Sequence, residues 1–222
     1  MRERADRILD AAAGLLVQLG YKKVTVEDIA QRAGIGKGTV YLHWSTKQQL
    51  FEAVFLREAV AYTDALRAAL RAEPAVVRPH RLLSESYLLV MGNPVLRELF
   101  SGDARFPRGG LTDVVARGRE LMAASNFYDV LIRHKLMRDD VPDLHYTLAA
   151  THAGFYLLDA YDPTAARDVQ DRAEALAFVV RHAFEPPAEP GRPALETAAA
   201  ELLTTIDQIL PPYERWIYSE NA

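Results

Sequence analysis

The chain opens with three short segments in which apolar residues recur every three or four positions, separated by turns that contain glycine. From residue 8 to residue 19 this spacing predicts an amphipathic helix that ends at Gly20. A second helix is predicted to start after Thr25, a good N-cap with an aspartate three residues later, and to end at Gly34. A third is predicted over 37–43. Two such helices joined by a tight glycine turn are the pattern of a helix-turn-helix.

The remainder of the chain is also predicted to be helical. A fourth helix is predicted from about 47 to 71, with Thr46 and Gln49 forming a second capping box. No segment of useful length alternates with the period of a strand. We therefore expect an all-α fold, with an N-terminal three-helix helix-turn-helix head over 1–46 and a C-terminal helical bundle over 47–222, in which the fourth helix is the connector. Further helices are predicted at about 76–92, 94–104, 112–138, 143–161, 163–184 and 194–210, with a proline-rich linker at 185–193.

Composition removes several classes of function. The chain has no cysteine, which excludes disulfides, thiolate zinc sites and cysteine nucleophiles. Hydrolase and metalloprotease motifs are absent, and the carboxylates are scattered over polar faces, so we expect no enzyme, no cofactor and no metal site. The N-terminal helix mixes charges into its apolar residues, unlike a signal peptide, and the longest uncharged run is too short and polar for a membrane span. A cytoplasmic protein is expected.

Charge is distributed unevenly along the chain. The net charge is −4, which by itself argues weakly against nucleic acid. However, residues 1–50 hold eight Lys and Arg against five Asp and Glu, whereas the remaining residues hold eighteen against twenty-five. A basic head on an acidic body favours a head that contacts polyphosphate.

The glycine-rich stretch "GIGKGTVYLHW" at 34–44 raises the question of which phosphate it meets. A nucleotide-binding loop needs a different glycine spacing, and it needs a strand before it rather than a capped helix. In a helix-turn-helix, the second helix would instead turn outward Lys37, Thr39, Tyr41 and His43, all of which can hydrogen-bond phosphates or bases.

The segment "TVEDIAQRAGIGKGTVYLHWSTKQQLF" at 25–51 resembles the DNA-binding domain of the tetracycline-repressor (TetR) family of bacterial transcriptional regulators. The cap, the turn, the aromatic pair and the lysine that opens the fourth helix stand in register, and the match covers roughly residues 3–55. The resemblance implies a double-stranded, pseudo-palindromic DNA operator as partner. It places Lys37, Gly38, Tyr41 and His43 at the major groove or its rim, and Thr25, Thr39 and Lys47 on phosphates.

Two predicted helices near the end carry narrow apolar stripes at spacings of four and three residues. Such stripes suit a helix-on-helix interface, either with a second copy of the chain or within the core of one subunit. The resemblance implies that the last two long helices pair with their twins in a four-helix homodimer interface. The expected interface residues are Val169, Ala173, Leu176, Val180, Leu195, Leu202, Ile206 and Ile209.

The middle of the chain is rich in large side chains, for which the resemblance implies a small-molecule pocket. The same residues could form plain core, and their content suggests an apolar or aromatic effector. His145, His152 and Asp159 are spaced at seven residues, two helical turns, which is too far for one metal ion. The expected pocket residues are Tyr87, Met91, Phe100, Phe127, Tyr128, His152, Phe155, Tyr156 and Asp159.

The resemblance therefore implies a sequence-specific transcriptional regulator, a repressor released from its operator when a small molecule binds the body. The alternative is a ligand-independent DNA-binding protein or activator whose body recruits a protein partner. A filled core with an exposed apolar patch would favour this alternative.

Overall fold

A computed structural model describes residues 2–100, 125–161 and 167–218, and within these ranges the chain is all-α. The expected fold class is confirmed, with ten α-helices, one 3₁₀ helix and no strand among the described residues. None of these helices combines the length and apolar content needed to cross a membrane. The elements are α1 (Arg2–Leu19), α2 (Val26–Ala33), α3 (Lys37–His43), α4 (Lys47–Ala72), η1 (Pro74–Val77), α5 (Pro79–Gly92), α6 (Pro94–Phe100), α8 (Ser125–Arg133), α9 (Leu144–Tyr161), α10 (Val169–Ala183) and α11 (Arg192–Ile217).

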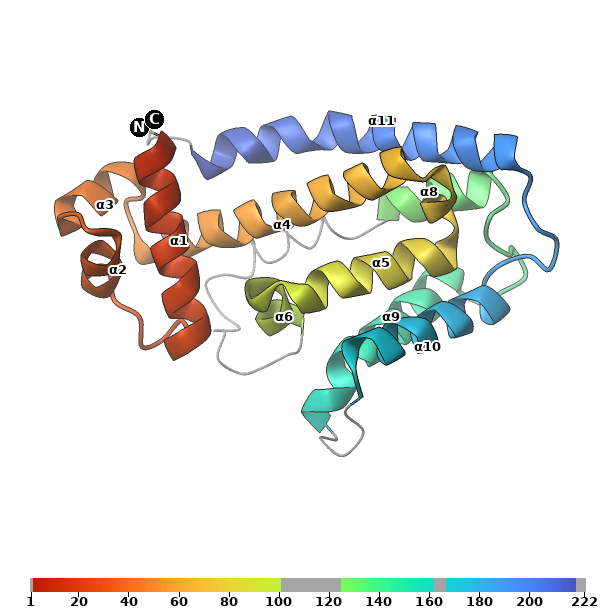
Figure 1. The fold of residues 1–222 in the computed structure, drawn as a ribbon, viewed down its shortest axis with the longest axis horizontal. Helices are drawn as coiled ribbons and strands as arrows, with labels where there is room; N and C mark the ends of the chain where they lie inside the picture. Colours follow the sequence, from red (N-terminus) through yellow and green to blue (C-terminus); the bar gives the residue numbers. More distant parts are fainter. Residues whose placement is uncertain (1, 101–124, 162–166, 219–222) are drawn as a thin grey trace.

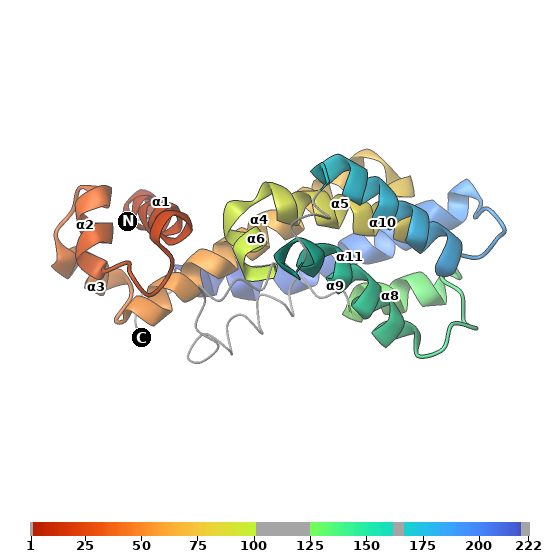
Figure 2. The same ribbon diagram turned by 90° about the horizontal axis from the view of Figure 1, so that it is seen from below.

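The molecule is elongated, with α1, α2 and α3 grouped at one end (Figures 1 and 2). We call residues 2–46 the head and the described residues from 47 onward the body. Helix α4 runs from the head along the length of the body, and α11 runs back beside it in the opposite direction (Figure 1). Both ends of the described chain therefore lie near the head.

Local sequence signals determine where the helices of the head begin and end. Thr25 accepts a hydrogen bond from the Asp28 backbone N–H at 3.1 Å, and the Asp28 carboxylate accepts one from the Thr25 backbone N–H at 2.9 Å. The predicted first capping box is thus confirmed. Gly34 ends α2 with a φ of 67°, in the left-handed region that glycine enters without strain.

The predicted second capping box is only half formed. Thr46 accepts a hydrogen bond from the Gln49 backbone N–H at 3.1 Å and so begins α4 as expected. The reciprocal bond is absent, because the Oε1 atom of Gln49 is buried without a hydrogen-bond partner. The N-cap alone is sufficient to start the helix.

The first turns of α4 are buried on every side. Seven successive residues, 50–56, are all buried, which is unusual for a helix whose faces normally differ in exposure. Around this part of α4 pack α1 from the head and α6 from the body, and α1 and α6 also contact each other. Head and body therefore share one continuous core at the start of α4.

The apolar stripes assigned to a dimer interface face the core of their own subunit. Ala173, Leu176 and Val180 are fully buried, and α10 packs along α5. Leu202 and Ile206 are likewise fully buried, and α11 packs along α4 and η1. Leu195 is also buried, whereas Val169 and Ile209 are half-buried. A side chain without exposed surface has no area to offer a second copy, so the buried stripes correspond to the core alternative.

Several predicted helix boundaries differ from those in the structure. Helix α10 begins at Val169 behind an N-cap at Asp168, later than the expected start at 163, and residues 162–166 lie outside the described residues. Helix α11 begins at Arg192 and continues to Ile217 through two internal prolines, beyond the expected end at 210. Of the helix expected at 112–138, the described part is α8, which ends at Arg133.

A buried carboxylate ties the end of α10 to the start of α5. Glu185 is buried and accepts hydrogen bonds from the backbone N–H of His80 at 2.7 Å and from Arg181 at 2.6 Å, and its carboxylate lies 2.6 Å from Nδ1 of His80. Burial alone would raise the pKa of Glu185, but these hydrogen bonds outweigh it and hold the pKa below its ordinary value.

We predict that Glu185→Gln lowers the free energy of unfolding by about 2 kcal/mol at pH 7, because the amide leaves a buried donor without an acceptor. The charged carboxylate stabilises the fold above the unfolded-state pKa, and this contribution is lost as the pH falls through the lowered folded-state pKa. The difference between the two proteins should therefore shrink below about pH 4.5. Denaturant unfolding at several pH values measures it.

Glu189→Gln is the matched control for this prediction. Glu189 also pairs with Arg181 and Arg78, but its side chain is largely exposed. Its loss should change stability by less than about 1 kcal/mol. An equal effect of the two substitutions would contradict a special role for the buried carboxylate.

Candidate nucleic-acid interface

Helix α3 presents one continuous exposed face at the free end of the molecule (Figure 1). Lys37, Gly38, Tyr41 and Leu42 are exposed, at spacings of three and four residues that place them side by side. Thr39 and His43, which were also expected to point outward, are half-buried at the edges of this face. The exposed face is the one that can enter a groove.

The core of the head fixes the direction of this face. Val40 and Trp44 are buried, together with Ile29 and Ala30 of α2. Because Val40 and Trp44 lie one turn apart on the inner side of α3, the opposite side must face solvent. The helix starts at Gly36 without a side-chain cap, so its orientation depends on this packing.

Two of the side chains expected to contact DNA, Lys37 at the groove or its rim and Thr25 on a phosphate, already have partners within the head. Lys37 forms an ion pair with Glu27 and lies 5.9 Å from the ring centroid of Tyr41. Its hydrogen bond lowers the pKa of Glu27. Thr25 donates its hydroxyl to Asp28 at 2.7 Å, so a phosphate would have to compete with that bond.

Lys47 lies at the junction between head and body. Its ammonium donates to the backbone carbonyl of Tyr21 at 2.6 Å and stands 4.4 Å from the centre of the Tyr21 ring. Partial burial lowers the pKa of Lys47. Lys47 is the first residue of α4, and the N-terminus of a helix favours an anion.

Leu42 is a candidate contact that the sequence analysis missed. It is 74% exposed, more than Tyr41 at 40%. The signal was available in the helical period, because residue 42 lies opposite the buried pair Val40 and Trp44, whereas residue 41 lies at the flank. An apolar side chain in a major groove can contact a thymine methyl group.

In the body, most of the expected pocket residues gather where α5, α6 and α9 meet. The Tyr156 ring lies 5.1 Å from the rings of both Tyr87 and Phe100 and 5.0 Å from that of His152. Phe155 lies 6.5 Å from Tyr87. We call these five residues the aromatic cluster.

The remaining expected pocket residues surround or miss this cluster. Phe127 is buried and Tyr128 is half-buried on α8, where the Tyr128 ring lies 6.1 Å from that of His145. Met91 is half-buried on α5. Asp159 falls in α9, but its side chain lies outside the described residues.

The polar side chains in and beside the aromatic cluster are uncharged at pH 7. Burial lowers the pKa of His152 to about 4, so its imidazole is neutral at pH 7, and the Tyr156 hydroxyl lies 3.3 Å from its Nε2. Tyr62, on α4, shares a 2.6 Å hydrogen bond with Ser86, and burial raises its pKa to about 12. Ser86 was not singled out from the sequence. Among the described residues, no three His, Asp or Glu side chains could hold a metal ion.

A chain of polar contacts leads from this region to the head. Asn93, between α5 and α6, donates to Glu58 at 2.7 Å, and Glu58 accepts from Arg57 at 3.1 Å. Arg57 in turn donates to Asp10 of α1 at 2.8 Å. Asn93 also caps α6 by accepting from the backbone N–H groups of Val95 and Leu96. We call Asn93, Glu58, Arg57 and Asp10 the polar relay.

Helices α9 and α10 leave an uncharged face uncovered in the single chain. Residues 144–158 of α9 contain no Asp, Glu, Lys or Arg, and one side packs inward through Leu148 and Tyr156. The other side is exposed, with Tyr146 at 71% and Leu158 at 51%, and Phe178 of α10 is 64% exposed. We call the exposed residues of α9 and α10 the α9–α10 face; besides His145 and His182, its residues other than Asp and Glu are Tyr146, Ala149, Ala150, Ala153, Gly154, Leu158, Gln170, Ala175, Phe178 and Ala183.

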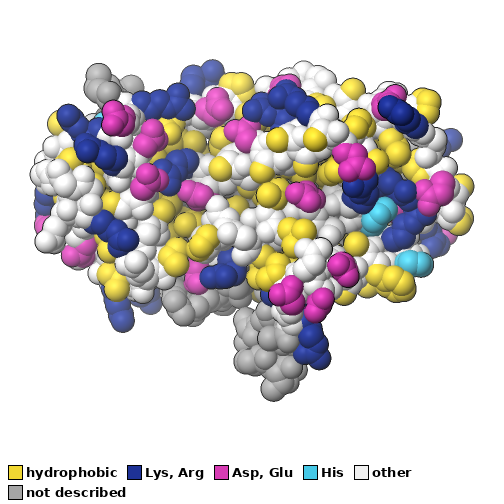
Figure 3. Space-filling model, in the orientation of Figure 1, with side chains coloured by type: hydrophobic (Ala, Val, Ile, Leu, Met, Phe, Trp, Pro, Cys, Tyr) yellow, Lys and Arg dark blue, Asp and Glu magenta, His cyan; other side chains and the backbone are white. Residues whose placement is uncertain are grey.

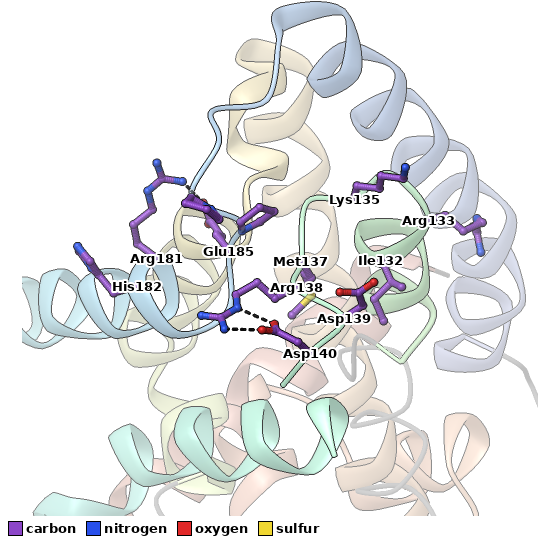
Figure 4. Close-up of a pocket in the computed structure, with 12 residues that line it drawn as sticks. Ile132, Arg133, Lys135, Met137, Arg138, Asp139, Asp140, Arg181, His182 and Glu185 are labelled. Carbon is purple, nitrogen blue, oxygen red and sulfur yellow. Dashed lines mark hydrogen bonds and ion pairs between the residues drawn. The ribbon is translucent and has the colours of Figure 1, made fainter. Parts of the chain in front are cut away.

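An open cleft of about 1050 Å³ lies at the far end of the body, between the segment that follows α8 and the end of α10 (Figure 4). Two pairs of charged side chains lie in its lining: Arg138 makes two 2.8 Å hydrogen bonds to Asp140, and Arg181 bonds Glu185. The residues expected for the ligand pocket are not among those that line it. On the face seen in Figure 3, acidic and basic side chains are interspersed over the body.

Comparisons with known proteins agree with the geometry of the head. The model of the family described as bacterial regulatory proteins, tetR family, matches residues 8–54. The HTH-type transcriptional activator FasR of Mycolicibacterium smegmatis is 38% identical over 69 residues, 31% of this chain and 32% of that protein. The HTH-type transcriptional repressor KstR2 of the same organism is 43% identical over 51 residues, 23% of this chain and 25% of that protein. The chain thus spans a third or less of the length of these two relatives.

Structural similarity extends over most of the chain. The transcriptional regulator FadR from Bacillus subtilis, solved in complex with stearoyl-CoA, superposes with a TM-score of 0.64 at 14% identity and covers 78% of this chain and 96% of its own. This likeness establishes a common fold. The family match across α2 and α3 shows that the helix-turn-helix head of this chain is similar to the heads of the tetR family of bacterial regulatory proteins.

Proposed function

We propose that this protein is a cytoplasmic, homodimeric transcriptional repressor that binds a pseudo-palindromic DNA operator through α3 and releases it when an apolar or aromatic molecule binds the body. The observation that carries the proposal is the exposed face of α3, held outward by a buried core at the free end of the molecule. The family match across this helix supports it.

In the proposed complex the face of α3 lies in the major groove. Tyr41 and Leu42 contact base edges, with Gly38 allowing close approach, while Thr39 and His43 reach the rim. Lys37, Lys47 and Thr25 contact phosphates; Lys37 and Thr25 do so by exchanging an internal acidic partner for the backbone of DNA. Two heads on one operator must reach successive major grooves, which requires a dimer.

DNA binding is tested with DNA from upstream of the protein's own gene, followed if needed by selection from a genomic library, at two salt concentrations. Tyr41→Ala and Leu42→Ala should each weaken operator binding about tenfold and unrelated DNA much less, because they remove base contacts. Lys47→Ala should reduce the steepness of the salt dependence by about one phosphate contact.

Lys135→Ala is the control for these variants, since it removes one exposed lysine at the far end of the body (Figure 4). It should bind the operator like the wild type. If Tyr41→Ala and Leu42→Ala also bind like the control, α3 does not read the DNA sequence. A wild type that retains no DNA even from the genomic library contradicts the regulator proposal.

For the dimer we propose the α9–α10 face in place of the buried stripes. A helix without charged residues is stabilised when its exposed side is also buried against protein. In a two-fold symmetric dimer, the same face of a second copy would bury it. Small residues such as Ala150, Ala153 and Gly154 permit close approach of two helices. Tyr146 and Phe178 would then be the large side chains that fit around the close crossing.

Phe178→Glu should convert the protein from a dimer to a monomer, because a carboxylate would be buried at the interface without a partner. Light scattering during size-exclusion chromatography should give about twice 24.8 kDa for the wild type and 24.8 kDa for the variant. Leu19→Glu, which introduces the same charge at an exposed leucine of the head, should remain a dimer. Dimeric Phe178→Glu would place the interface elsewhere.

For the effector we propose the aromatic cluster as the binding site and the polar relay as the link to the head. A ligand that contacts Tyr156 and Phe100 would also contact α6, because Phe100 is the last residue of that helix. Helix α6 contacts α1 of the head, and its N-terminus is capped by Asn93 of the polar relay. Only a ligand with different affinities for the DNA-bound and free states can shift operator binding. The stearoyl-CoA complex of FadR supports a site for apolar molecules in this fold.

Operator release by a panel of apolar and aromatic compounds tests this link. For a compound that releases the operator, Tyr156→Phe should weaken compound binding by removing a hydroxyl. Asn93→Ala should leave compound binding unchanged but reduce release, because it breaks the relay between the body and α1. Calorimetry and DNA binding measure the two effects separately. A panel in which no compound changes operator affinity twofold favours the ligand-independent alternative.

A further inference from the structure

The last turn of α11 leaves the body and packs on the head (Figure 1). The Tyr218 hydroxyl donates to Asp6 of α1 at 2.6 Å, and the guanidinium of Arg2 lies 4.6 Å from the centre of the Tyr218 ring. Ile217 is buried beside it. A residue more than 200 positions away in sequence thus contacts the first two turns of the chain.

The preceding part of α11 is fixed to the body. Asp207 accepts a hydrogen bond from Arg67 at 3.0 Å and one from Arg71 at 3.3 Å, and both arginines lie on α4. Leu202, Ile206 and Leu210 are buried in the core. The part of α11 that precedes the prolines is therefore held to the body, by the ion pairs of Asp207 with α4 and by further packing on η1 and α8.

Two successive prolines separate these two contacts. Pro211 and Pro212 lack the N–H groups that would bond the carbonyls of residues 207 and 208, and their rings crowd the preceding turn. Such a site bends a helix. Both prolines are exposed, so packing of their rings does not account for their position. A bend at this site would set the direction in which the last turn of α11 leaves the body.

We propose that the last turn of α11 braces the head and that Tyr218 is a positioning residue for DNA binding. The head is joined to the body through α4, through the contacts of α1 with α6 and through the Arg57–Asp10 pair, all near the start of α4. The further attachment of α11 at Tyr218 limits how far the head can pivot about that junction. A head held in place has less orientational freedom to lose on binding DNA. The DNA-binding part of this proposal rests on the proposed function, whereas the brace itself does not.

Hydrogen exchange of α1 amides tests the brace without DNA. In Tyr218→Ala, α1 amides should exchange about fivefold faster, because the local opening energy falls, while α5 and α10 amides are unchanged. Tyr218→Phe retains the ring over Arg2 and should be intermediate. Tyr213→Ala, at a half-buried tyrosine of the same helix, should match the wild type. A variant with both prolines replaced by alanine retains every contacting side chain, yet should loosen α1 like Tyr218→Ala.

Operator affinity tests the positioning role. Tyr218→Ala should bind the wild-type operator about threefold to tenfold more weakly, with Tyr218→Phe restoring most of the loss. Unchanged α1 exchange in Tyr218→Ala overturns the brace. Faster exchange with unchanged operator affinity overturns the positioning role. If the wild type binds no DNA at all, the regulator proposal and the positioning role both fail, and the exchange measurement still decides whether α11 braces the head.

Discussion

Burial of the start of α4 is the constraint on which the rest of the structure depends. Because residues 50–56 are covered on every side, the helix cannot roll about its axis without exposing apolar surface. A change in the body that acts through α4 would therefore reach the head as a shift or tilt of this helix as a rigid element. The contacts of α6 with both α1 and α4 place the aromatic cluster within one helix of that element.

Several charged side chains around this core form hydrogen bonds and ion pairs that link one helix to another. Arg57 joins α4 to α1 through Asp10, Asp207 joins α11 to α4 through two arginines, and Glu185 joins the end of α10 to the start of α5. Exposed ion pairs contribute little to stability, so the value of the first two lies in fixing geometry. Glu185 differs because it is buried and must keep its partners.

The sequence predicted features that short-range chemistry determines. Thr25, Gly34 and the inward side of α3 were assigned correctly, because caps and helical period involve only neighbouring residues. The end of α11 was predicted incorrectly. A helix can continue through prolines where the carbonyls that lose their N–H partners face water, and the contacts of Tyr218 with the head stabilise the last turn of α11.

Longer-range features need the neighbours that only the fold supplies. The apolar stripes at 169–180 and 195–206 were expected to pack on a second helix, either in a dimer or within one subunit. Periodicity cannot tell which helix covers a stripe; within the subunit, α10 packs along α5 and α11 along α4. The aromatic cluster was found from residue type, whereas Ser86 and the polar relay consist of ordinary polar residues that become distinctive only when the helices pack.

The uncharged face of α9 also has a consequence for how the protein forms. In the proposed dimer, a subunit that folds alone exposes this helix to water until it meets a second copy, so folding and association are thermodynamically linked. The apparent stability then depends on protein concentration, and dilution unfolds the molecule at a lower temperature. At the low copy numbers typical of regulators, the amount of functional protein in a cell would depend on expression level more steeply than linearly.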